Sequence, residues 1–250
     1  MMAADISRAL DPVLLAQDAG VTLDDWQAAF ISNIPRRAIL NCSRQGGKST
    51  AVALAALHTA LFQPGALVVI FSPTQRQSSM LNRKILKYHH RLSGVPRIRM
   101  ENSQRVEFDN SSQCLVMPGT EKTVRGISGP DMLIIDEAAR VEDPLFFACA
   151  PMLSTKPNGK FILLSTPAGR RGEFFRLYHE AGNDWHRVRV PATDCPRITQ
   201  AHLDEQLRDL GPAQFAAEYL CEFVDHNVSA FTNHTIEGAF SSSVRPLWAA

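Results

Sequence analysis

A short apolar segment that runs directly into a glycine-rich loop constrains the fold of this chain more than any other feature. The apolar segment is residues 38–42 (AILNC), the loop is residues 43–50 (SRQGGKST), and an alanine-rich, helix-forming segment follows at residues 51–61. In the order strand, loop, helix, backbone N–H groups of the loop and of the helix N-terminus bind phosphate oxygens. Gly46 and Gly47 let the backbone approach such a ligand closely. The segment therefore predicts a P-loop.

The loop departs from the strict P-loop pattern at one position. The pattern asks for Gly, four further residues and then Gly-Lys-Ser or Gly-Lys-Thr, and Cys42 replaces the first glycine. We expect Lys48 to place its charge near the β- and γ-phosphates of ATP, and the Ser49 hydroxyl to ligate magnesium. The alternative is a strand–turn–helix that contains Gly-Gly-Lys-Ser by chance. The predicted nucleotide-binding residues are Trp26, Gln27, Ser43, Arg44, Gln45, Gly46, Gly47, Lys48, Ser49 and Thr50.

A second motif joins an apolar strand to two acidic residues. Residues 132–135 (MLII) are followed by Asp136 and Glu137. At the carboxyl end of a strand, Asp136 is expected to hold the magnesium ion, and Glu137 is expected to act as the base that orients the attacking water. The second carboxylate favours a hydrolytic ATPase over a GTPase or a kinase, because it stands where water must be activated. A core strand that ends in exposed acids is the alternative interpretation.

Two weaker motifs complete the predicted site. Ser165-Thr166-Pro167 closes a strand at residues 160–164, and a similar tripeptide in helicase-like ATPases senses the γ-phosphate and relays its presence to the DNA-binding part. A plain turn after the strand is the alternative. Upstream of the loop, Gln27 is expected to read the adenine edge and Trp26 to cover the ring. A buried Trp beside a solvated Gln is the alternative there.

The alternation of strands and helices predicts an α/β fold with a mostly parallel central sheet covered by helices on both faces. The motifs favour a P-loop NTPase of the additional-strand, catalytic-glutamate type. Residues 1–170 are predicted to be the ATPase core, residues 171–223 a small helical linker subdomain packed on it, and residues 224–250 a tail. Further elements are expected as a strand at 66–71, a β-hairpin at 105–109 and 113–117, and helices at 5–19, from 24 onward and at 74–91.

Composition and charge are those of an ordinary globular chain. The 250 residues are 45% hydrophobic and 20% charged, with a formal net charge of +1, so a DNA-binding face must be a local patch. No apolar run is long enough for a secretory signal or a membrane span, and we expect a cytosolic protein with no membrane partner. The five cysteines include no C-x-x-C pair, which favours buried thiols over a zinc site or disulfides.

Together these motifs resemble the large terminase subunits of tailed bacteriophages, over approximately residues 20–235. Residues 219–223 (YLCEF) are similar to that family's junction between motor and nuclease. Three details carry the resemblance: the loop form Ser43-Arg44-Gln45-x-Gly47-Lys48-Ser49; Val124-Arg125-Gly126 shortly before Asp136-Glu137-Ala138-Ala139; and Ser165-Thr166-Pro167 followed by a Gly- and Arg-rich segment and Phe174-Phe175.

The resemblance implies a magnesium-dependent ATPase, the motor domain that translocates double-stranded DNA into a procapsid. It implies a homo-oligomeric ring with the portal protein and the small terminase subunit as partners, in the host cytoplasm and transiently at the portal vertex. The family usually carries a second, RNase H-like nuclease domain with an acidic two-metal site. After Glu222 the only acids are Asp225 and Glu237, and such a site needs several carboxylates, so we expect a missing or truncated nuclease domain and no nuclease activity.

Arginines are the expected contacts of phosphate charge. The resemblance implies that Arg44 contacts the γ-phosphate or Glu137 in cis, with a solvent-facing loop charge as the alternative. Arg125 is the competing candidate, a finger delivered in trans, because a loop that enters a parallel strand lies away from its own nucleotide. Two clusters are candidates for DNA phosphate contacts, with solvated surface as the alternative for each: Arg97, Arg99 and Arg105, and Arg170, Arg171 and Arg176.

Two other functions stay open from the sequence. A helicase-like DNA-dependent ATPase shares the same motifs, but it normally needs a second motor domain for which the residues after Ser165 leave too little length. A nucleotide-binding switch that does not hydrolyse is the other alternative, and Glu137 argues against it.

Overall fold

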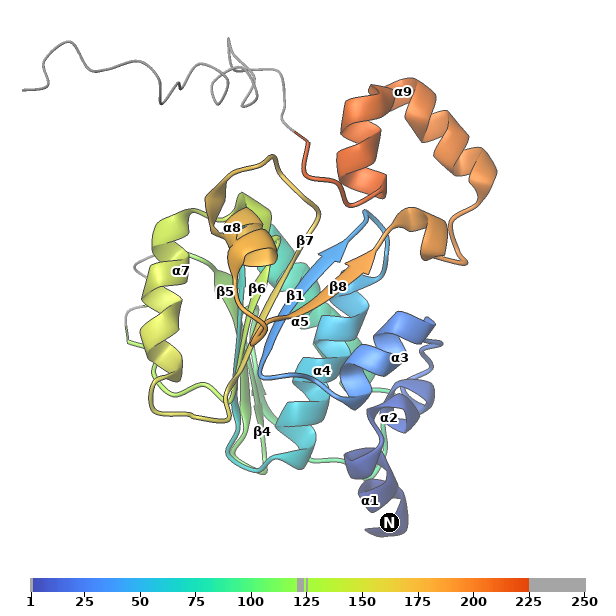
Figure 1. Cartoon of the computed structure of the whole chain (residues 1–250). Coiled ribbons are helices and arrows are strands. Elements are labelled where there is room, and N and C mark those ends of the chain that lie inside the picture. The colour runs from blue at the N-terminus through green and yellow to red at the C-terminus, as the bar shows by residue number, and fades with distance from the viewer. Residues whose placement is uncertain (1, 121–123, 125, 225–250) are drawn as a thin grey trace, which may run out of the picture.

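Parallel strands with apolar side chains on both faces form the centre of the molecule, as a computed structural model shows for residues 2–120, 124 and 126–224 (Figure 1). Within these residues the sheet has eight strands, in the order β3-β4-β5-β2-β6-β7-β1-β8. The strands β3, β4 and β5 pair antiparallel at one edge, and all other neighbours are parallel. The bounds are β1 Arg37–Cys42, β2 Leu67–Ser72, β3 Ile98–Glu101, β4 Arg105–Phe108, β5 Gln113–Pro118, β6 Met132–Asp136, β7 Lys160–Ser165 and β8 His186–Val190.

The predicted fold class is confirmed by the strand order. β7 lies between the P-loop strand β1 and the acidic strand β6, pairing parallel with both. This inserted strand is what distinguishes the additional-strand type of P-loop fold. The expected hairpin is also present, because β4 and β5 pair antiparallel around the polar turn at residues 109–112.

Alternate side chains of the central strands enter two separate hydrophobic cores. Leu40 and Ile70 point to one face, where α4 packs, whereas Ile39 and Val69 point to the other. Figure 1 shows α3 and α4 on one side of the sheet and α7 and α8 on the other. The helices are α1 Met2–Leu10, α2 Pro12–Asp18, α3 Asp25–Ser32, α4 Lys48–Phe62, α5 Gln75–His89, α7 Asp143–Cys149, α8 Gly172–Glu180 and α9 Gln200–Tyr219, with short 3-10 helices η1 Ala138–Arg140, η2 Ala150–Leu153 and η3 Ala192–Asp194.

The structure corrects two expectations from the sequence. The single helix expected at residues 5–19 is two helices, because Asp11 caps α2 by accepting from the N–H of Val13, and Pro12 starts that helix. The short edge strand β3 was not expected at all. Its residues are mostly exposed, so it lacks the apolar run that marks a central strand.

The chain beyond residue 170 contributes to the sheet. β8 pairs parallel with β1 along residues 186–190, so the sheet extends past the expected boundary of the core. Between Val190 and Val224 the regular structure is purely helical, and Figure 1 shows α9 beyond the ends of β1 and β8. Gly211 (φ 73°, ψ 167°) and Pro212 break α9 into two arms. The expected tail, apart from Val224, lies outside the described residues.

All five cysteines are buried and none forms a disulfide, as their sequence spacing predicted. Among the described residues, no helix has the length and apolar character to cross a membrane.

Candidate nucleotide-binding site

The glycine-rich loop leaves β1 at Cys42 and enters α4 at Lys48, which places it at the carboxyl edge of the parallel sheet. Gly47 adopts the left-handed conformation (φ 88°), and a Cβ atom there would collide with the side chain of Gln27. Gln45 is also left-handed, at φ 59°. The Nζ atom of Lys48 donates to the carbonyl oxygens of Cys42 at 3.1 Å and Ser43 at 3.0 Å. The ammonium group of this buried lysine is thus hydrogen-bonded to two backbone carbonyl groups of the loop.

Gln27 ties the loop to helix α3. Its Nε2 donates to the carbonyl of Gly47 at 3.0 Å, and its Oε1 accepts from the N–H of Asp24 at 2.9 Å. The side chain also lines the cavity described below. Trp26 does not line this cavity; it packs against the core and faces a separate hollow with Asp24 and Arg197.

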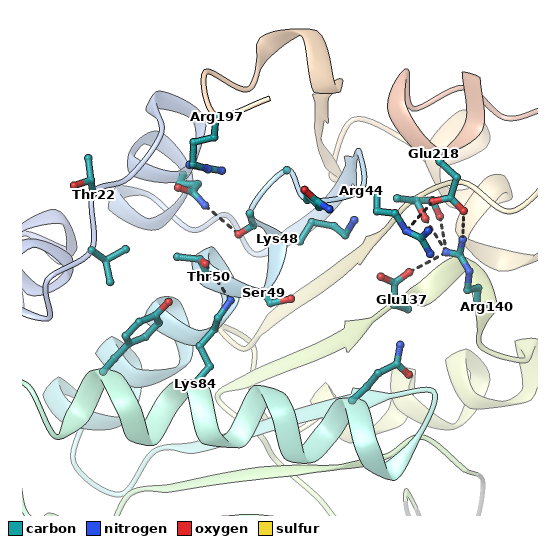
Figure 2. A pocket seen from close by; sticks show the side chains of 18 residues that line it. Thr22, Arg44, Lys48, Ser49, Thr50, Lys84, Glu137, Arg140, Arg197 and Glu218 are labelled. Atoms are coloured by element: carbon teal, nitrogen blue, oxygen red, sulfur yellow. Dashed lines mark hydrogen bonds and ion pairs between the residues drawn. The ribbon is translucent and has the colours of Figure 1, made fainter. Parts of the chain in front are cut away.

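A single cavity of about 580 Å³ lies between the loop, the end of β6 and helix α5 (Figure 2). This volume is typical of small-molecule sites. Val21, Thr22 and Tyr88 are among its lining residues, and the motifs had indicated none of the three. The remaining lining residues are Gln27, Arg44, Gln45, Gly46, Gly47, Lys48, Ser49, Thr50, Gln77, Lys84, Glu137, Arg140, Thr166, Arg197 and Glu218.

Glu137 faces this cavity from the residue after β6. Its backbone is left-handed (φ 51°), a conformation that ends the strand abruptly and starts η1. The carboxylate Oε2 accepts from Arg140 Nη1 at 2.9 Å and from the hydroxyl of Ser165 at 3.4 Å. The structure therefore brings the expected base and the expected coupling motif together across adjacent strands. Pro167 is buried and does not line the cavity.

Arg140 lines the cavity, although none of the sequence motifs indicated it. Its Nη1 donates to the hydroxyl oxygen of Thr166 at 2.8 Å as well as to Glu137, and its Nη2 donates to Glu218 Oε1 at 3.1 Å. Figure 2 shows its guanidinium beside both carboxylates. The only feature of the sequence that could have indicated Arg140 is its position three residues after Glu137. On a helical turn, side chains at this spacing are close enough to contact each other.

Helix α9 reaches the same cavity through Glu218. The backbone N–H of Arg44 donates to the carbonyl of Glu218 at 2.8 Å, and the Nε of Arg44 lies 3.6 Å from Glu218 Oε2. Arg44 borders the cavity, but 65% of its side chain is exposed. Glu218 is thus shared by two arginines, one on the glycine-rich loop and one after the acidic strand.

Asp136 has the character of a cation ligand. It is buried at the end of β6, and burial together with the neighbouring charge of Glu137 raises its pKa to about 7. The charges of Lys48 and Lys84 act in the opposite direction. A buried carboxyl of this kind is costly when ionised alone, and a divalent cation held by it and by the Ser49 hydroxyl would remove that cost. The residues present therefore fit a magnesium ion.

Arg125 lies outside the described residues, so its predicted role stays a prediction. Its neighbours Val124 and Gly126 border a different cavity, against α7 and η2. The segment that connects β5 to β6 starts at Pro118, at the same edge of the sheet as the glycine-rich loop, because β5 is parallel to β2. It ends at Asp131, at the opposite edge of the sheet.

The two arginine clusters lie apart from the cavity. Arg97 and Arg99 are exposed around β3, whereas Arg105 pairs with Glu107. In the second cluster, Arg170 donates to the carbonyl of Phe223 at 3.0 Å, and Arg176 pairs with Glu173. Arg171 is exposed.

The fold and the cavity define a P-loop NTPase of the additional-strand type. The sequence model of the family "Terminase large subunit, T4likevirus-type, N-terminal" matches residues 39–237. The chain belongs to this family, which favours the terminase interpretation over a helicase-like ATPase.

Relatives and solved structures agree with this assignment. The terminase large subunit of Thermus phage G20c is 24% identical over 242 residues, covering 82% of this chain and 50% of the relative. The large terminase ATPase domain of Thermus phage P74-26 superimposes with a TM-score of 0.74 at 20% identity, over 84% of this chain and 97% of that one. A large terminase from a thermophilic bacteriophage, solved in complex with ADP, gives 0.62 at 14% identity, over 76% and 49%. The chain spans about half the length of the curated relatives it matches.

Proposed function

We propose that this chain is the ATP-hydrolysing motor domain of a terminase large subunit, which translocates double-stranded DNA into a procapsid. The observation that carries the proposal is the meeting of Lys48 and Glu137 in one cavity. A cation over a phosphate-binding loop and a carboxylate across from it are the two groups that hydrolysis of a nucleoside triphosphate needs. The ADP complex of the similar terminase from a thermophilic bacteriophage supports an adenine nucleotide as the ligand.

Several residues in and beside the cavity have distinct parts in this reaction. The backbone N–H groups of the loop and of the α4 N-terminus bind phosphate oxygens. Lys48 exchanges its two carbonyl partners for phosphate oxygens, a stronger interaction because both partners are then charged. Glu137 accepts a proton from the attacking water and orients it. Arg140 and Ser165 are positioning residues, because they hold the carboxylate of Glu137.

Magnesium belongs to the proposal as well. Ser49 and Asp136 would hold the ion, which neutralises charge on the phosphates when it is bound. Asp136 must be ionised for this, and Lys48 and Lys84 favour its ionised form.

The partners and assembly of the motor are proposals too. The double-stranded DNA would be held by phosphate contacts, for which the exposed Arg97, Arg99 and Arg171 are candidates. Membership in the family supports the portal protein and the small terminase subunit as further partners, and a homo-oligomeric ring as the assembly. The contact between Glu218 and both Arg44 and Arg140 supports a coupling of α9 to the state of the cavity.

Phosphate release tests the enzymatic part of the proposal. The purified chain is expected to release phosphate from ATP when magnesium is present, and Lys48→Ala is expected to abolish release and weaken ATP binding. Lys87→Ala, an exposed lysine on α5, is the matched control that keeps activity. ATP binding without any phosphate release by the wild-type chain and its assembled ring would instead support a non-hydrolysing nucleotide switch.

A further inference from the structure

Helix α5 brings a second lysine into the nucleotide cavity. Lys84 is half-buried, and its Nζ donates to the hydroxyl oxygen of Thr50 at 3.1 Å. Thr50 is in the first turn of α4, immediately after the expected magnesium ligand Ser49. Figure 2 shows Lys84 rising from α5 toward Thr50 and Ser49. Its ammonium group therefore lies beside the part of the helix that is expected to face phosphate.

The charges around the cavity single out this lysine. Among the lining cations, Arg44 and Arg140 form ion pairs with Glu218, and Arg197 forms one with Asp24. The other two lining cations, Lys48 and Lys84, form no ion pair with a carboxylate anywhere in residues 2–120, 124 and 126–224. One of the two is the P-loop lysine. The second, Lys84, has a neutral hydroxyl as its hydrogen-bond partner, and it interacts with the charge of Asp136 without forming a close ion pair.

Burial without a close ion pair has a cost for Lys84. Desolvation, with a smaller contribution from the charge of Lys87, lowers the pKa of Lys84 below its usual value, although the charge of Asp136 acts in the opposite direction. A lysine on this helix can instead extend into solvent, as the exposed Lys87 does three residues later. A polyanionic ligand in the cavity would offset the cost, because a partly desolvated cation binds a phosphate oxygen more strongly than a fully hydrated one.

We propose that Lys84 is a second phosphate-binding residue of this site, which contacts the nucleoside diphosphate part of the ligand from the side opposite the glycine-rich loop. Its partner Thr50 follows Lys48 by two residues in α4, so Lys84 acts on the phosphates nearer the nucleoside than those that Lys48 reaches. The role therefore concerns binding of ADP as much as of ATP. This inference rests on the proposed nucleotide site.

The experiment is a titration of ADP and magnesium into the intact chain by calorimetry, which needs no turnover. Lys84→Met keeps the length of the side chain and removes its charge, Lys84→Arg keeps the charge, and Lys87→Met removes an exposed charge from the same helix. Because hydrogen bonds to charged groups are the stronger ones, Lys84→Met is expected to weaken ADP binding about ten- to hundredfold. Lys84→Arg is expected to stay within about threefold of the wild type, as is Lys87→Met.

Thermal unfolding of the ligand-free proteins separates a binding role from a structural one. Lys84→Met is expected to unfold at the same temperature as the wild type or higher, since it removes a desolvated charge. Unchanged ADP affinity in Lys84→Met, or an equal loss in Lys87→Met, would overturn the role of Lys84. A lower unfolding temperature with unchanged affinity would assign Lys84 to helix packing. A wild-type chain that binds no ADP would overturn the nucleotide site itself, which is a different result.

Discussion

Arg140 and Glu218 lie 78 residues apart in the chain, yet their guanidinium and carboxylate groups meet at 3.1 Å. Glu218 is on α9, after the last strand, whereas Arg140 ends the 3-10 turn that follows β6. The same guanidinium holds the carboxylate of Glu137 and the hydroxyl of Thr166. One arginine thus connects the expected general base, the expected coupling motif and the helical segment.

A double-mutant cycle measures whether Arg140 and Glu218 act together. Arg140→Ala is expected to slow phosphate release by about ten- to hundredfold while ATP affinity changes little, since the base is then free to leave its position. Glu218→Gln is expected to have a smaller effect of the same kind. The change in activation free energy of the double variant should differ from the sum of the changes in the two single variants by about 0.5–3 kcal/mol, as is found for residues in one network. Strict additivity would show that α9 does not act through Arg140.

Glu137→Gln separates binding from chemistry. The amide keeps the shape of the carboxylate and can still accept from Arg140, but it cannot take a proton from water. The variant is expected to bind ATP with an affinity near that of the wild type and to release phosphate at least about a hundredfold more slowly. Equilibrium binding and single-turnover phosphate release check this. If ATP binding is lost together with turnover, Glu137 is structural.

Asp136 predicts a pH dependence of the ligand-free protein. Its pKa of about 7 lies above the usual carboxyl value, so between about pH 4 and pH 7 the folded state binds more protons than the unfolded state. The contribution of this group to stability is therefore present at low pH and is lost as the pH rises through 7. As the pH rises from 5 to 8, the free energy of unfolding of Asp136→Asn should therefore increase by on the order of 2–4 kcal/mol relative to that of the wild type.

Urea unfolding of both proteins at the two pH values, without nucleotide or magnesium, checks this expectation. Glu218→Gln, which removes a different cavity carboxylate, is the control that should not show the same gain. A stability difference between Asp136→Asn and the wild type that does not change with pH would contradict a raised pKa. In the presence of ATP, Asp136→Asn is expected to raise the magnesium concentration that the reaction requires.

The trans role of Arg125 predicts complementation between two inactive variants. Arg125→Ala subunits keep an intact glycine-rich loop, and Glu137→Gln subunits keep an intact finger. If the finger is delivered by a neighbouring subunit, the mixture regains activity that neither variant has alone, because such an arginine accelerates hydrolysis by about 10³-fold or more. The wild-type chain should show a specific activity that rises with protein concentration. A mixture that stays inactive, while the wild type is active and assembled, would leave Arg44 in cis as the candidate.

The sequence predicted the parts of this site that lie within a few residues of one another. The loop at residues 43–50 follows an apolar strand, Asp136 ends another and Glu137 comes directly after it, and parallel strands present their carboxyl ends at one edge. The meeting of the loop and Glu137 in one cavity was therefore predictable. The break between α1 and α2 could also have been read from Asp11 and Pro12, but the periodic apolar residues on both sides concealed it.

Adjacent residues were harder to assign, as Trp26 and Gln27 show. Successive side chains on a helix point about 100° apart, so one of the two had to face away from the loop. The structure turns Gln27 toward Gly47 and Trp26 toward the core. Sequence periodicity could not choose between them, because α3 is short and mostly apolar.

The sequence by itself determined the P-loop, the acidic strand and the α/β class, because each depends on the order of neighbouring segments along the chain. In both motifs an apolar strand is followed by residues whose backbone or charge suits a phosphate-binding site. Only the tertiary structure decided that Arg140, Glu218 and Lys84 border the same cavity. They come from a turn, a helix after the last strand and a helix beside the loop. No sequence period joins them, since their proximity results from strand order and from helix packing on the sheet, and both depend on contacts between residues far apart in the chain.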